Sequence, residues 1–358
     1  MKLVWGTVVA VDSARDDLQK LTVELDTGEA GTALNYPALA GICAEGDRVL
    51  LNTTAVELGL GTGGSHFVVA RQGSDGIALD APSGGHIMKL RYTPLQLDVM
   101  AVEAPESPSH EIMAAADSLD GMPVVCCGLH SQVPLVAAAV KRARPDARVA
   151  YCATDGAALP LALSEVIVAS CAASLIDTTI TCGQAFGGEL EAVNLHSGLL
   201  AARHVAGADV AIVAIGPGVA GTSTPFGHGG VAQGEAINAV ASLGGQPVAC
   251  LRVSFADARE RHRGVSHHTL AALTKVALAP AIVAVPTLSA EYSDAIAEGL
   301  LKAGVEARHT LVTSPEGTVD APPMQGVRVT TMGRGSADDP AFFAAAFAAG
   351  EIASRIHP

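Results

Sequence analysis

Two patterns of hydrophobic positions divide this chain. Up to residue 71, short runs rich in β-branched residues are separated by turn formers such as Asp26-Thr27-Gly28-Glu29. This pattern predicts a small all-β domain, a barrel or a sandwich, over residues 1–71. From residue 111 onward, near-continuous apolar runs alternate with Ala-rich segments of helical period. That alternation predicts an α/β domain over residues 111–358, with a Rossmann-like parallel sheet covered by helices on both faces.

Residues 72–110 are predicted to connect the two domains. Loop-like stretches flank the sequence HIMKLRYTPLQ, which we expect to be an extended segment. Its cations Lys89 and Arg91 either join an anion site or are solvated charges on an edge strand. In the α/β domain, RHTLVTS and GVRVTTM, at 308–314 and 326–332, are candidate strands that extend the sheet.

The amino-acid composition and net charge favour some classes of binding partner and argue against others. Hydrophobic residues make up 49% and charged residues 16%, and so few charges predict that apolar surface is covered in a homo-oligomer. The net charge of −14 argues against nucleic-acid binding. Seven cysteines without a CxxC spacing favour a reducing, cytoplasmic compartment. Apolar runs of membrane-spanning length are absent from the sequence, so no membrane partner is expected.

The chemistry is expected where the parallel strands end. Ligands bind outside the carboxyl ends of such strands, and the most distinctive loop there is Gly216–Gly230. Its glycines let backbone N–H groups approach an anion, and a predicted helix follows it. The candidate ligand-binding residues of this loop are Gly216, Gly218, Gly221, Thr222, Ser223, Thr224, Gly229 and Gly230. The loop matches neither GxGxxG nor a Walker A motif, and a plain glycine-rich connection remains the alternative.

A second loop concentrates cations and imidazoles. Guanidinium groups suit carboxylates and phosphates, and imidazoles exchange protons near neutral pH. Ser266 is the expected N-cap of the helix that follows. The candidate anion ligands are Arg259, Arg261 and Arg263, and the candidate acid–base residues are His262, His267 and His268. The alternative is a solvated turn whose charges pair on the surface.

A metal site competes with the anion site. Ligand atoms are available from Asp257, His228, Cys182 and the three histidines of the second loop. The spacing HxxxxHH of these three histidines is not a recognised metal-binding motif. We expect the adjacent His267 and His268 to point apart on a helix and the arginines to repel a cation, so no metal ligands are assigned. Cys182 is a candidate nucleophile with His130 or His228 as its base, although a buried cysteine at a strand end is the favoured explanation.

Three motifs are distinctive in combination: HIMKLRYTPLQ, GPGVAGTSTPFGHGG and VSFADARERHRGVSHHTL. Together they resemble an uncharacterised bacterial family catalogued only as a domain of unknown function. The resemblance spans nearly the whole chain. It implies a bacterial cytoplasmic protein, but it transfers no activity and no catalytic residue.

The residues therefore carry the functional expectation alone. They favour binding, with or without enzymatic turnover, of a small anionic metabolite that bears phosphate or carboxylate. A non-catalytic oligomeric assembly module and a metal-dependent hydrolase remain as alternatives. No cofactor is assigned.

Overall fold

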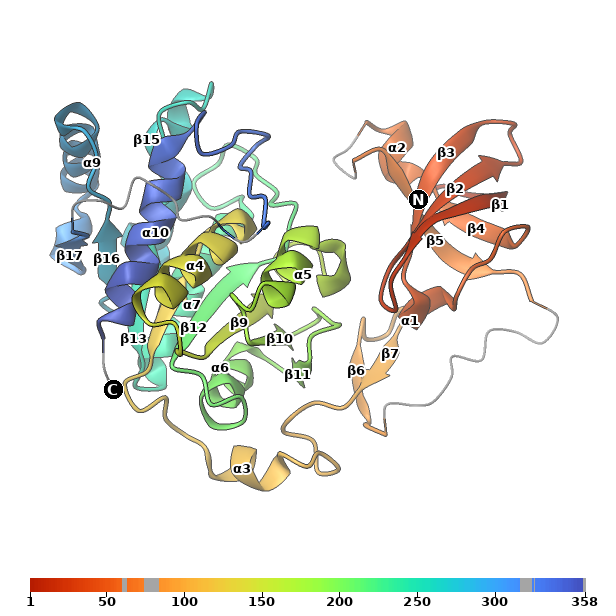
Figure 1. The fold of residues 1–358 in the computed structure, drawn as a ribbon, viewed down its shortest axis with the longest axis horizontal. Helices are drawn as coiled ribbons and strands as arrows, with labels where there is room; N and C mark the ends of the chain where they lie inside the picture. The colour runs from red at the N-terminus through yellow and green to blue at the C-terminus, as the bar shows by residue number, and fades with distance from the viewer. Residues whose placement is uncertain (60–62, 74–83, 316–323, 325, 357–358) are drawn as a thin grey trace. The chain divides into compact units, whose positions relative to one another are not determined.

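The computed structural model describes residues 1–59, 63–73, 84–315, 324 and 326–356 (Figure 1). Two compact units divide the chain, Met1–Met100 and Ala101–Pro358. Residues 74–83 of the predicted connector lie outside the described residues. Among the described helices, none combines the length and the apolar character that crossing a bilayer requires.

The first unit contains a closed five-stranded barrel in the order β1-β2-β3-β5-β4. Only β3 and β5 pair in parallel, and the other pairs are antiparallel. Side chains alternate between the barrel interior and the outside, so Leu21, Val23 and Leu51 are fully buried. The strands are β1 Leu3–Ala14, β2 Gln19–Leu25, β3 Ala30–Asn35, β4 Arg48–Asn52 and β5 Ser65–Arg71.

Short elements complete this unit. Two one-turn helices, α1 Pro37–Ala40 and α2 Thr54–Glu57, lie in barrel connections. The segment HIMKLRYTPLQ begins as β6 Ile87–Lys89, which pairs antiparallel with β7 Leu97–Val99. The predicted extended segment is therefore one strand of a hairpin.

The second unit is built on an eight-stranded sheet in the order β11-β10-β9-β12-β8-β13-β16-β17, and every neighbouring pair is parallel. The predicted Rossmann-like sheet preceded by a small barrel is confirmed. The strands are β8 Pro123–Cys126, β9 Val149–Thr154, β10 Thr178–Cys182, β11 Leu190–Ala192, β12 Val210–Ile215, β13 Gln246–Cys250, β16 Ile282–Val285 and β17 Thr310–Thr313.

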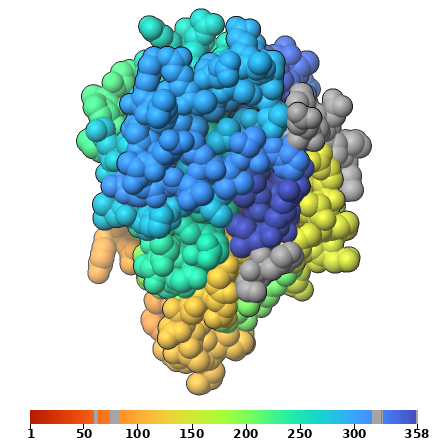
Figure 2. All heavy atoms as spheres, turned by 90° about the vertical axis from the view of Figure 1, so that its left-hand side faces the viewer, coloured from red at the N-terminus to blue at the C-terminus, as the bar shows by residue number. Residues whose placement is uncertain are grey.

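Helices cover both faces of the sheet, each over its own apolar core. On one face lie α4 Val133–Ala143, α5 Glu165–Ala172 and α10 Pro340–Ser354. On the other lie α6 Leu195–His204, α7 Ala232–Ser242 and α9 Ala290–Ala303. A further short helix, α3 His110–Ala115, precedes β8. The surface of α9 and its neighbours faces the viewer in Figure 2.

Helix α10 lies beside α4 in Figure 1 and is buried along almost its whole length. A Cβ atom on Gly350 would lie 2.4 Å from the carbonyl oxygen of Val136, so only glycine allows this close approach. The candidate strand at 326–332 is wrong, because residues 327–330 are irregular and Thr331 forms only an isolated bridge with Arg334.

The neighbouring strands β8 and β12 form the switch point of the sheet. The chain leaves β8 for α4 on one face and leaves β12 for α7 on the other face, and such a divergence opens a crevice at the strand ends. Gln233 of α7 caps two neighbouring strands, since its Nε2 donates to the carbonyl oxygens of Cys126 at the end of β8 and Cys250 at the end of β13, at 2.8 and 2.7 Å. The buried strand ends are thereby satisfied by a side chain.

Candidate functional site

Two loops that are distant in the sequence meet at the carboxyl edge of the sheet. The glycine loop, Gly216–Gly230, follows β12, and the arginine–histidine loop is Ala256–His268. The imidazole rings of His228 and His268 stack with centroids 3.7 Å apart and an angle of 5° between their planes. A Cβ atom on Gly221 would lie 3.5 Å from Cε1 of His268. The two loops are therefore in contact at this edge.

A short hairpin and a capped helix position the arginine–histidine loop. Strand β14, Val253–Ser254, pairs antiparallel with β15, Gly264–Val265, and helix α8, His267–Ala271, follows. The Ser266 hydroxyl accepts a hydrogen bond from the His268 backbone N–H at 3.3 Å, so the predicted N-cap is confirmed. Helix α8 continues as a π-helical turn, a feature that is frequent at functional sites.

Four imidazoles gather where the loops meet. The ring centroids of His267 and His268 are 4.3 Å apart, and the His262 centroid lies 5.0 and 4.8 Å from them. The His267 centroid lies 5.6 Å from that of His228. The expectation that His267 and His268 point apart is therefore wrong. Both rings pack against His228, so this tertiary contact, rather than helical spacing, sets their directions.

The surroundings of all four rings favour the neutral form of imidazole. Burial lowers the pKa of each ring, to about 3 for His262 and about 2 for His268, and the nearby Arg252 guanidinium lowers each pKa further. His262 Nδ1 lies 2.7 Å from the Ser266 hydroxyl. A neutral imidazole has one lone pair available for a proton or a metal ion.

Beside the imidazoles lies a buried network of arginines and carboxylates. Asp257 is 4% exposed and accepts hydrogen bonds from Nε and Nη2 of Arg259 at 2.9 and 2.8 Å. Nη2 of Arg252 and of Arg334 lie 3.8 and 3.7 Å from the same carboxylate. Arg334 also pairs with Asp339, which accepts a hydrogen bond from the Ser254 hydroxyl at 2.7 Å. The hydrogen-bonded guanidinium of Arg259 holds the pKa of Asp257 well below its usual range.

This network makes the site electropositive. Three guanidinium groups, those of Arg252, Arg259 and Arg334, face the two carboxylates of Asp257 and Asp339, which leaves one positive charge in excess. Arg252 extends the field into the imidazole cluster, where its Nη1 lies 3.4 Å from Nδ1 of His268. Burial lowers the pKa of Arg252 to about 10, which still leaves it charged at pH 7.

The three predicted anion-binding arginines have different environments. Arg259 is hydrogen-bonded to Asp257 inside the network, and its role as a direct anion ligand stays a prediction. Its carboxylate partner lies only two residues away, and the sequence did not show which of the nearby charges would pair. Arg261 and Arg263 are exposed. Arg252 and Arg334 were missed because each is isolated in the sequence from the cluster of charges.

Most of the glycine loop bonds to itself. Thr222 N donates to the Gly227 carbonyl at 2.8 Å, and Gly229 N donates to the Ala220 carbonyl at 3.0 Å. Gly216 permits a close backbone approach, because a Cβ atom there would lie 2.3 Å from the Ala158 carbonyl oxygen. Thr222, Ser223 and Thr224 are exposed at the tip. The Thr222 and Thr224 hydroxyls also bond within the loop, so much of the predicted amide cradle is occupied by its own hydrogen bonds.

The remaining candidates lie elsewhere in their units. Cys182 is buried at the end of β10, where a Cβ atom on Gly198 would lie 2.3 Å from its sulfur. The His130 ring Nε2 lies 2.7 Å from the Ser164 hydroxyl. In the first unit, Lys89 is buried and Arg91 is exposed, and their part in an anion site stays a prediction.

A pocket of about 430 Å³ opens beside the imidazole cluster. Both loops contribute to it, since Ser223 and Pro225 come from the glycine loop and His267 comes from the start of α8. Its floor is completed by Leu270, Ala271, Thr274, Lys275 and Ala303. His267 is only half-buried, so a ligand in this pocket reaches an imidazole directly.

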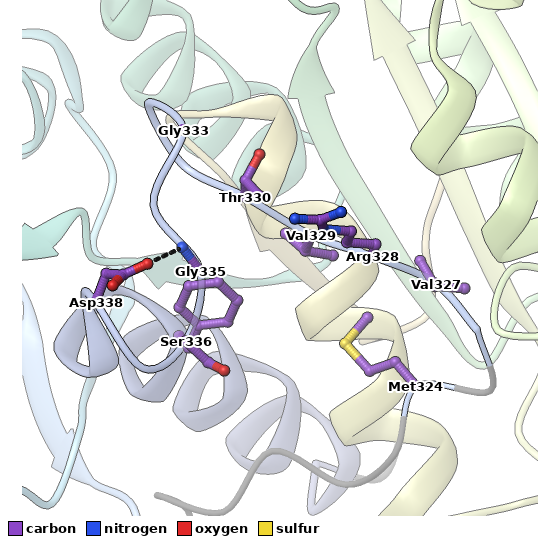
Figure 3. Close-up of a pocket in the computed structure, with 10 residues that line it drawn as sticks. Met324, Val327, Arg328, Val329, Thr330, Gly333, Gly335, Ser336 and Asp338 are labelled. Atoms are coloured by element: carbon purple, nitrogen blue, oxygen red, sulfur yellow. Dashed lines mark hydrogen bonds between the residues drawn. The ribbon is translucent and has the colours of Figure 1, made fainter.

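A second pocket, of about 410 Å³, lies along the segment that precedes α10 (Figure 3). Its side chains include Arg328, Thr330 and Phe343, and the Asp338 carboxylate accepts a hydrogen bond from Gly335 N at 3.0 Å. The sequence was interpreted there as a strand, so this pocket was missed.

Comparison with family models matches residues 32–350 to one family, whose description is "Protein of unknown function (DUF3866)". The resemblance to a family of unknown function, which the three motifs indicated, is thereby confirmed. Neither a curated protein nor a solved structure matches the chain.

Proposed function

Because the chain belongs to the DUF3866 family, whose description states no function, we propose from the site alone that the second unit binds a small anionic metabolite bearing phosphate or carboxylate. One observation carries the proposal. The glycine loop and the arginine–histidine loop are in contact at the carboxyl edge of the sheet, beside a pocket of about 430 Å³. In open α/β sheets, ligands bind at this place.

The local charge supports an anionic metabolite as the ligand of the pocket. The chain has a net charge of −14, yet the buried network beside the site has an excess positive charge. Lys275 lines the pocket, and the exposed Arg261 belongs to the adjacent loop. Cations gathered in a cleft focus the field there and attract anions even to an acidic protein.

The exposure of each side chain indicates its proposed role in ligand binding. Lys275 and Arg261 supply charge to the ligand, and the Ser223 hydroxyl supplies a hydrogen bond. Asp257 and Arg259 hold the arginine–histidine loop in place through their paired hydrogen bonds. If the bound ligand reacts, His267 is the imidazole that lines the pocket and can exchange a proton with it.

Thermal-shift screening with phosphorylated and carboxylated metabolites tests the proposal directly. We expect at least one class to raise the melting temperature, and the shift to be lost in an Arg261→Ala, His267→Ala double variant. Arg355→Ala is the matched control. It removes an exposed arginine at the far end of α10, about 22 Å along that helix from Asp339. Absence of any shift, or an equal shift in the double variant, would contradict anion binding.

Homo-oligomerisation and a cytoplasmic location remain predictions. Four apolar side chains on the outside of β1 support an association surface, and they are 36–46% exposed: Leu3, Trp5, Val9 and Val11. Sedimentation velocity of the wild type and of Val9→Lys checks the first prediction. A monomer at all concentrations would contradict it, whereas a smaller species in Val9→Lys would place the contact on β1.

A further inference from the structure

We infer that His228, His267 and His268 form a binding site for a divalent transition-metal ion of the zinc class. One ring nitrogen from each of these residues lies within 4.8 Å of the other two. Zinc–nitrogen bonds of about 2.0–2.1 Å place the nitrogens of tetrahedral ligands about 3.3 Å apart. Side-chain rotations that move each ring nitrogen by about 1 Å would therefore bring the three nitrogens to bonding distance of one ion. The ligands come from the glycine loop and from the first turn of α8.

His228 has the environment of a metal ligand. Its ring is 5% exposed, its Nε2 lies 3.2 Å from the Pro225 carbonyl oxygen, and its Nδ1 is buried without a hydrogen-bond partner in the described structure. A carbonyl can only accept, so Nε2 carries the proton and Nδ1 carries the lone pair. Metal-binding histidines are commonly oriented in this way, with the second nitrogen donating to a backbone carbonyl.

His267 supplies a second available nitrogen. Its Nε2 is buried and has no hydrogen-bond partner among the described residues. Buried polar atoms are normally satisfied, and an unsatisfied one in a native structure often marks a missing water or ion. Two such nitrogens on adjacent rings, one from each loop, point to a shared ligand.

His268 must move most when the ion binds. Its ring is parallel to that of His228, and parallel rings cannot both direct their in-plane lone pairs at one ion. Its Nδ1 also receives a long contact from Arg252, at 3.4 Å. Metal binding therefore tilts the His268 ring out of the stack and loosens the Arg252 contact. The space beside its edge is open, because Gly221 has no side chain there and a Cβ atom would lie 3.6 Å from Nε2.

His267 also lines the pocket, so a small ligand held there would be next to an ion bound by this residue. Three protein ligands and one open position are the pattern of catalytic zinc, where a bound water becomes acidic. Three neutral imidazoles leave the ion's charge uncompensated, and Arg252 adds to it. An anion in the fourth position offsets both, so anion and metal should strengthen each other's binding. This last step rests on the proposed function, whereas the ligand set does not.

Metal binding is measured on the full chain after treatment with a chelator. Equilibrium dialysis against Co²⁺ and Zn²⁺, followed by elemental analysis, should give one ion per chain, with a tetrahedral Co²⁺ absorption spectrum. Affinity should fall about tenfold or more in His228→Ala and in His267→Ala. His196→Ala, which removes an exposed histidine from α6, is the matched control and should bind as the wild type does.

X-ray absorption spectroscopy of the metal-loaded wild type tests the ligand set without any variant, so its result does not depend on whether the variants fold. Three imidazole ligands are expected, and fewer than two would overturn the inference. So would no binding by the folded wild type, or equal loss in His196→Ala. Repeating the Co²⁺ titration with methylphosphonate separates the two proposals. Tighter Co²⁺ binding supports both, whereas unchanged Co²⁺ binding leaves the metal site standing and counts against the anion.

Discussion

At the scale of single residues, the site depends on which charges are buried together. Asp257 is surrounded by three arginines, and its carboxylate is almost fully removed from solvent. A buried ion pair adds little by itself, but removing one member leaves the others uncompensated. Burial lowers the pKa of the imidazoles beside this network most, and Arg252 lowers it further, so the stability and the chemistry of the site share this arginine.

Asp257→Asn should therefore destabilise the second unit by about 3–5 kcal/mol, because Arg252 and Arg259 lose their countercharge. Urea denaturation measures the change. Glu298→Gln is the control in the same unit, since its exposed pair with Lys302 should contribute nothing measurable. Similar unfolding curves for Asp257→Asn and the control would show that the network is not a stabilising unit.

His130 makes stability depend on pH. Burial lowers the pKa of its ring from 6.5 to about 4, so the unfolded chain binds this proton more readily than the folded chain does. Its contribution is fully present above pH 6.5 and is lost as the pH falls from about 6.5 to about 4. The expected slope is at most about 1.4 kcal/mol per pH unit.

His130→Gln keeps a partner for Ser164 and removes the titrating ring. Urea titrations between pH 7 and pH 5 should show a shallower loss of stability in this variant than in the wild type. His196→Gln, at an exposed position on α6, should retain the wild-type slope. Equal slopes in wild type and His130→Gln would contradict the assignment.

At the scale of secondary-structure elements, the helices differ in how closely they pack. Helix α10 lies against α4 with no room for a side chain at Gly350, whereas α9 is amphipathic and partly exposed. The same substitution should therefore have opposite effects on the two helices. Alanine favours a helix by about 1 kcal/mol over glycine wherever space permits.

Gly350→Ala should destabilise the second unit by about 1–3 kcal/mol, because the new methyl group overlaps the Val136 carbonyl and forces α10 away from α4. Gly299→Ala in α9 meets its nearest neighbour at 3.8 Å and should stabilise by about 0.5–1 kcal/mol. Thermal denaturation measures both changes. Changes of the same sign in the two variants would contradict this packing argument.

At the scale of the whole molecule, the two units have separate apolar cores. One core fills the barrel and contains Leu51, and two more flank the parallel sheet. Calorimetry should therefore resolve two transitions. Leu51→Ala should lower the transition of the first unit alone, by about 2–5 kcal/mol in stability, and Asp257→Asn should lower only the other. A joint shift of both transitions by either variant would show that the units unfold together.

Much of the fold could be predicted because the burial of a strand or helix determines the pattern of apolar residues within its own sequence. A strand buried on both faces, such as Val210–Ile215, reads as a continuous apolar run. The site could be predicted only as two loops at one sheet edge. The partner of Arg259 depended on the side-chain directions in a short hairpin, and the segment at 326–332 failed because its β-branched residues line a pocket instead of pairing.

The sequence by itself determined the alternation of strands and helices, the all-β start of the chain, and the presence of imidazoles and guanidinium groups after the apolar runs. These features follow from periodicity and composition, which are properties of neighbouring residues. Only the tertiary structure decided that His228 stacks on His268 and that Arg252 and Arg334 reach Asp257. His228 and His268 are 40 positions apart, Arg334 and Asp257 are 77 positions apart, and Ser254 and Asp339 are 85 positions apart. Contacts over such separations depend on strand order and loop packing, and no local pattern encodes them.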